Sequence, residues 1–183
     1  PDYYACYHKC CQVDGENNVT YERMPEFTKV GDFTLEDYNQ FKLPGQTGTA
    51  MMRREIALID GISLPRLRFT PGDRLIPLAA MYKGKIYCSD DVMSAYRSVV
   101  SSSHQSWSKK YGMDNLFGNY FFFRMHRELE KVGRAAGLKV DMRLPDSEMF
   151  YNVLVRAFFW KWRSFILLVI YMMLVPSHRL FML

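Results

Sequence analysis

The C-terminal stretch 147–183 constrains this chain most, because it contains an uninterrupted apolar run, 165–175, that ends at Pro176. No glycine or proline lies between Ser147 and that proline, which cannot continue a helix. We therefore predict one long helix whose second half enters a membrane. The run is shorter than the roughly 20 residues that a bilayer core needs. The predicted transmembrane segment therefore extends over about 158–176 and leaves a short tail.

Basic and tryptophan residues precede the apolar run, which is typical of the level of lipid headgroups. Cations at this level attract anionic lipid, such as cardiolipin, by about 1 kcal/mol each. More cations precede the run than follow it, so the positive-inside rule places the bulk of the chain on the cytoplasmic or matrix side. A helix buried in protein, or a strand, is an alternative for the same run. The predicted lipid and interface anchors are Arg156, Trp160, Lys161, Trp162 and Arg163, and the predicted membrane segment is Phe165, Ile166, Leu167, Leu168, Val169, Ile170, Tyr171, Met172, Met173, Leu174 and Val175.

The length of 183 residues suits one soluble domain with an anchor. The net charge of +5 is spread along the chain, so it fits anionic lipid, RNA or an acidic partner equally well. Of the four cysteines, Cys6, Cys10 and Cys11 stand close together with His8, but structural zinc sites join two separated pairs of ligands. Free thiols are therefore expected, with a metal site or a disulfide to Cys88 as alternatives.

Residues 1–49 are rich in turn signals and scattered aromatic residues, which favours an extended arm that wraps a partner. A loop-rich part of the same globule is the alternative. Within this stretch, 34–41 predicts one short helix capped by Thr34, with Asp37 three residues on. The glycine-containing stretch 44–49 lacks the Lys-Ser/Thr pair of a phosphate loop and is predicted to be a flexible linker.

Residues 50–146 predict a small α+β soluble region. Short apolar runs in 51–87 predict two to four strands, with hairpin turns at 71–73 and 83–85. Ser89 and two aspartates then resemble the start of an amphipathic helix. A second amphipathic helix is predicted over about 114–136, with Gly137 as its end. The predicted fold is thus α+β: a small β-hairpin or sheet element, two amphipathic helices, the N-terminal arm and the membrane-entering helix.

No arrangement of residues predicts chemistry. His104, His126 and His178 have no neighbouring nucleophile or ligand set, and His126 is expected on a solvated basic face beside Arg124 and Arg127. The sequence therefore predicts no catalytic, cofactor-binding or metal-binding residue. It favours a non-catalytic accessory subunit of a multi-subunit membrane complex, placed in the mitochondrial inner membrane as part of a respiratory complex or ATP synthase, with its bulk in the matrix. The alternatives are a basic RNA-associated protein of mitoribosome type with a protein-buried C-terminal helix, and a tail-anchored enzyme.

Overall fold

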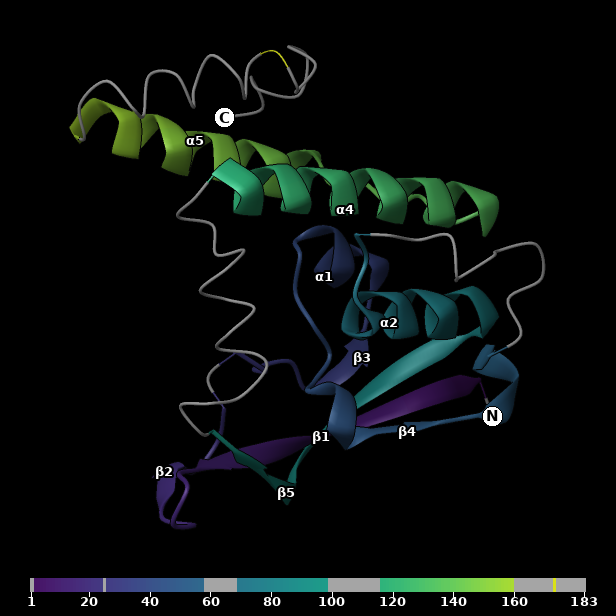
Figure 1. Ribbon diagram of the computed structural model, residues 1–183. Helices are drawn as coiled ribbons and strands as arrows, with labels where there is room; N and C mark the ends of the chain where they lie inside the picture. Colours follow the sequence, from purple (N-terminus) through teal and green to yellow (C-terminus); the bar gives the residue numbers. More distant parts are fainter. Residues whose placement is uncertain (1, 25, 58–68, 99–115, 160–172, 174–183) are drawn as a thin grey trace.

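The computed structural model describes residues 2–24, 26–57, 69–98, 116–159 and 173 (Figure 1). They form a curled mixed sheet with helices layered on one of its faces. The α+β class predicted from the sequence is therefore confirmed. The predictions of an extended N-terminal arm, of the first amphipathic helix and of the membrane-entering helix are wrong.

The sheet is organised around its first strand, which lies in the middle rather than in an arm. Strand β1 runs parallel to β5 along one edge, and β4 and β2 pair with its other edge in antiparallel fashion. Strand β3 pairs with the far side of β5. The residues that alternate inward along β1 are buried, which the scattered aromatic pattern did not reveal. The strands are β1 (Tyr3–Val13), β2 (Val19–Tyr21), β3 (Gly31–Phe33), β4 (Ala50–Met52) and β5 (Lys85–Arg97).

Strand β5 replaces the helix that Ser89 was predicted to open. The Ser89 hydroxyl does accept a hydrogen bond from the backbone N–H of Asp91, at 3.2 Å, but both residues belong to the strand and no helix follows them. Parallel pairing with β1 continues as far as Val13 opposite Arg97. That ladder joins segments about 80 residues apart, so no local signal can show it, and tertiary pairing overrides the local helix preference.

Helix α2 (Gly72–Lys83) occupies the place of a predicted hairpin. Pro71 stands at its N-cap, so the Pro-Gly-Asp sequence begins a helix instead of making a turn. Pro77 lies inside the helix and is fully buried. It lacks one backbone N–H, and the burial of Leu78, Ala79 and Ala80 compensates for that loss.

Two helices were predicted correctly. The short helix α1 (Leu35–Asn39) has the Thr34 cap, whose hydroxyl accepts a hydrogen bond from the N–H of Asp37. Helix α4 (Leu116–Ala135) ends before Gly137, whose φ of +69° is the left-handed conformation that glycine adopts readily. The remaining elements are the 3-10 turns η1 (Thr47–Thr49) and η2 (Arg54–Ala57) and the helix α5 (Arg143–Phe159).

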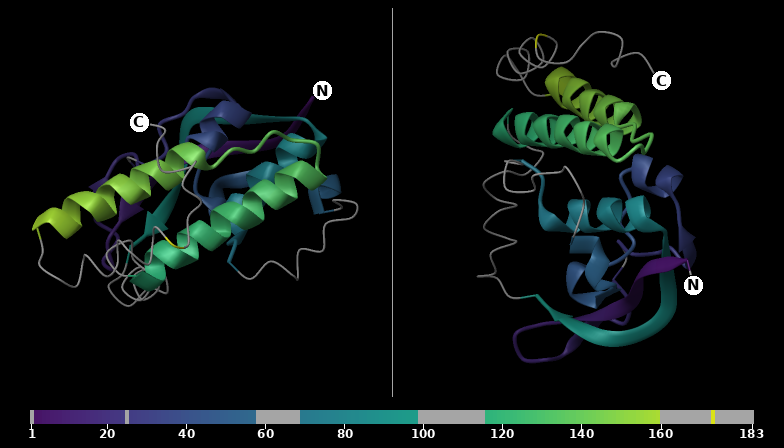
Figure 2. Two further views of the ribbon diagram at one scale, coloured as in Figure 1. Left: turned by 90° about the horizontal axis from the view of Figure 1, so that it is seen from above. Right: turned by 90° about the vertical axis from the view of Figure 1, so that its right-hand side faces the viewer.

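The layers follow from the apolar faces of these elements. Helices α1 and α2 lie between the sheet and the pair α4 and α5, and α4 and α5 lie side by side as the outer layer (Figure 2). One core runs through all of these layers. It includes Ala5, Tyr7, Phe33, Tyr38, Leu78, Ile86, Met125, Leu129 and Met142, which are all buried.

The prediction of a C-terminal helix entering a membrane is wrong. Helix α5 is described over Arg143–Phe159, so it begins four residues before the predicted start. Its 17 residues include two arginines, one aspartate and one glutamate. Within the described ranges no helix combines the length and the apolarity that crossing a bilayer requires. The assignment to a mitochondrial membrane complex loses the support of that span, and the described residues do not test it.

Candidate functional site

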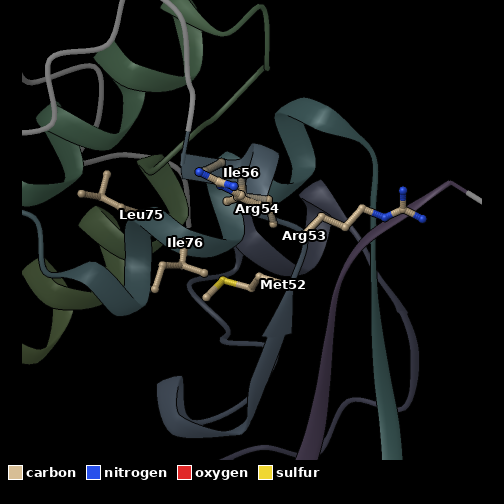
Figure 3. Close-up of a pocket in the computed structure, with 7 residues that line it drawn as sticks. Met52, Arg53, Arg54, Ile56, Leu75 and Ile76 are labelled. Atoms are coloured by element: carbon tan, nitrogen blue, oxygen red, sulfur yellow. The ribbon is translucent and has the colours of Figure 1, made fainter.

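A pocket lies between the end of β4, the turn η2 and one face of α2 (Figure 3). Its volume of about 360 Å³ is within the usual range of ligand-binding cavities. Five of its seven lining side chains are apolar, and the other two are arginines. The lining residues are Met52, Arg53, Arg54, Ile56, Leu75, Ile76 and Ala79.

Two separate segments of the chain build this pocket. The backbone N–H of Arg53 donates to the carbonyl oxygen of Tyr4 at 2.9 Å, which ends the pairing of β4 with β1. The turn η2 follows and directs Ile56, only 6% exposed, into the interior. Ala79 follows Leu75 by four residues and Ile76 by three in α2, so each of the two shares a face with Ala79, and all three line the pocket.

The two arginines at the pocket differ in the contacts that their side chains make. The Arg53 Nε donates to the carbonyl oxygen of Tyr3 at 2.8 Å, and its guanidinium lies 5.2 Å from the centre of the Tyr4 ring. Figure 3 shows this side chain pointing away from Met52 and Ile76, toward β1. Arg54 is exposed and makes no hydrogen bond or ion pair with any residue that the structure describes. Its positive charge is therefore available at the rim of the pocket.

Strand β4 presents one edge to solvent beside this pocket. Arg53 and Tyr4 form a hydrogen-bonded pair, so the next such pair along the ladder is Met51 and Cys6. Met52 lies between these pairs, and its N–H and C=O therefore point away from β1. No pairing partner for them occurs in the described part of the chain. Met51 and Met52 are 70% and 45% exposed.

Edge strands of this kind are usually protected against pairing by lysine, proline or a bulge. Strand β4 has the sequence Ala-Met-Met and its pairing with β1 is regular, so its short length of three residues is the one protection that it has within the described chain. The pocket continues from that edge, since Met52 belongs to both. The edge and the pocket together can accept an extended backbone and one apolar side chain.

A second group of functional residue types lies far from the pocket, between α4 and α5. The Asp146 carboxylate is 2.7 Å from Nδ1 of His126 and 2.7 Å from Nη2 of Arg127. Arg127 also pairs with Glu130 at 3.0 Å, and Glu130 accepts from the backbone N–H of Met142. Burial raises the pKa of Glu130, against the opposing effects of that N–H and of Arg127. Four polar side chains thus join the two helices.

The arrangement holds helices together rather than presenting a reactive group. The His126 ring is 1% exposed and lies edge-on to Phe41 at 4.8 Å between ring centres, so substrate has no access to it. Its Nε2 is buried without a hydrogen-bond partner among the described residues. The expectation of a solvated basic face at His126 is therefore wrong. No local pattern in the sequence indicates that Asp146 pairs with His126, a residue 20 positions earlier.

The cysteines are distributed along the central strands. Cys6, Cys10, Cys11 and Cys88 are all free thiols. Cys10 Sγ lies 3.3 Å from Met24 Sδ, and Cys88 Sγ is 3.4 Å from the carbonyl oxygen of Pro44. Burial raises the pKa of Cys88 to about 11, so this thiol is unreactive at neutral pH. In the parts of the chain that the structure covers, no three His, Cys, Asp or Glu residues are placed to hold a metal ion.

Two predicted features have different outcomes. The stretch 44–49 is not a flexible linker, because Pro44 and Gly45 are buried and a side chain at Gly45 would contact the Tyr7 ring.

The predicted lipid anchors are not tested. Trp160, Lys161, Trp162 and Arg163 lie outside the described residues, as does the side chain of Arg156. Of the predicted membrane segment only Met173 is described, and it is 80% exposed.

Comparison with known proteins adds no assignment, since no family model, curated protein or solved structure matches this chain.

Proposed function

We propose that this chain is a polypeptide-binding domain, in which an extended segment of another protein adds to the free edge of β4. The observation that carries the proposal is the outward-facing N–H and C=O of Met52 directly beside an apolar pocket. Strand addition uses such groups for affinity and adjacent pockets for side-chain specificity. The predictions of an RNA-associated role and of an absence of catalysis stay predictions.

The energetics favour an extended peptide with one large apolar anchor. Burial of a Leu, Ile or Phe side chain contributes about 1.5–3 kcal/mol. Each backbone hydrogen bond contributes about 0.5–1.5 kcal/mol net. The anchor would lie against Ile56, Leu75 and Ile76, and its neighbours in the strand would cover the exposed face of Met51.

The test is selection from a phage-displayed library of random twelve-residue peptides, followed by Kd measurement with the selected peptides in fluorescein-labelled form. The decisive variant is Met52→Pro, because its N–H points outward and the β1 ladder uses the N–H groups of Met51 and Arg53 instead. We expect Met52→Pro to weaken binding about tenfold or more, since the bound peptide then has an unpaired carbonyl group. Met52→Leu keeps the N–H and is the matched control.

Three results would contradict this proposal. The selection returns no binding peptide, or Met52→Pro leaves Kd unchanged. The third contradicting result is a larger loss in the free energy of unfolding for Met52→Pro than for Met52→Leu. Such a loss would mean that the edge is already paired within the chain. Association of the wild-type chain with itself, abolished by Met52→Pro in sedimentation experiments, would instead identify the partner as a second copy.

A further inference from the structure

We infer that the segment bound at β4 carries an aspartate or glutamate two residues from its apolar anchor, and that Arg54 selects it. This inference depends on the proposed function and adds the chemistry of the partner. It begins from the charge of the pocket rim. The seven described lining residues include two arginines and no carboxylate, so the charge that they present to an incoming segment is positive.

Only one of the two arginines has a guanidinium available for a partner. Arg53 donates to Tyr3 and lies near the Tyr4 ring, and it points away from the cavity (Figure 3). Arg54 lies beside Ile56 in the same view, at the rim. Glu55 follows it in sequence but forms no ion pair with it among the described residues. Arg54 can therefore offer its planar guanidinium to a carboxylate of the bound segment.

The position of that carboxylate follows from strand geometry. Side chains two residues apart in a strand lie on the same face, about 6.6 Å from each other. A segment whose anchor enters the pocket therefore directs the residues two before and two after it toward the same rim. One of these positions faces Arg54, whichever direction the segment takes. We thus expect an apolar residue with Asp or Glu two positions away.

The experiment compares peptide selection on the wild-type chain with selection on Arg54→Glu. Wild-type selection should enrich Asp or Glu two positions from the anchor, and Arg54→Glu should enrich Lys or Arg there. For one selected peptide, replacement of its Glu by Gln should raise Kd about fivefold on the wild-type chain and have no effect on Arg54→Gln. Arg53→Gln is the matched control and should retain the fivefold difference. The difference should shrink as salt is raised, because the pair lies at a solvent-exposed rim.

The outcomes separate the two proposals. Peptides that need the Met52 N–H but show no acidic enrichment would refute the role of Arg54 and leave strand addition intact. Equal enrichment on the wild-type chain and on Arg54→Glu would refute it as well. If no selected peptide depends on the Met52 N–H, strand addition is refuted. The proposal of an acidic partner, which rests on strand addition, is then refuted as well.

Discussion

Replacement of Asp146 by alanine should destabilise the protein by about 3 kcal/mol. The carboxylate is fully buried and receives hydrogen bonds from His126 and Arg127, both at 2.7 Å. Removal of one partner from a buried ion pair costs about 3–5 kcal/mol. The lower figure applies because Arg127 is 28% exposed and keeps its pair with Glu130. The predicted loss corresponds to about 6–12 °C in Tm for a chain of this size.

The assay is urea unfolding followed by circular dichroism, with Asp90→Ala as the control. Asp90 also pairs with an arginine, Arg23, at 2.6 Å, but both side chains are more than half exposed. An exposed pair contributes about 0–1 kcal/mol, so this variant should stay within that range. If Asp146→Ala and Asp90→Ala lower the free energy of unfolding equally, then the cluster does not hold α4 against α5. Asp146→Asn, which keeps the volume and removes the charge, should fall between the two.

Two further predictions concern pH and packing. Burial is the largest single influence on Asp37 and opposes its ionisation, but the hydrogen bonds from Lys29 and Thr34 and the charge of Lys29 together outweigh it and lower the pKa to about 2. Stability from this group is therefore complete above pH 4 and lost as pH falls from about 4 to 2, and acid titration of Asp37→Asn should lack that loss. Gly133→Ala should destabilise by about 1–3 kcal/mol despite better helix propensity, because the new Cβ lies 2.7 Å from Cβ of Val140. Gly72→Ala, with open space around it, should not destabilise in thermal melts.

Local signals in the sequence were sufficient wherever a structure depends on neighbouring residues. The capping box of α1 joins Thr34 and Asp37, three residues apart, and its hydrogen bonds form within one turn. The apolar stripe of α4 and the glycine that follows it likewise need no distant partner. The α+β class follows from such signals, and so does the existence of these two helices.

The tertiary structure alone decided the features that depend on distant partners. Strands β1 and β5 pair with each other although about 80 residues separate them in the sequence. Neither strand has the regular alternation of apolar and polar residues that identifies a half-buried strand. The same reason applies to His126 and Asp146, which meet only because α5 folds back along α4. The candidate site is a third case. Arg54 and Ile76 line one pocket only because α2 lies over the edge of β4. The sequence does not predict which strand edge stays unpaired.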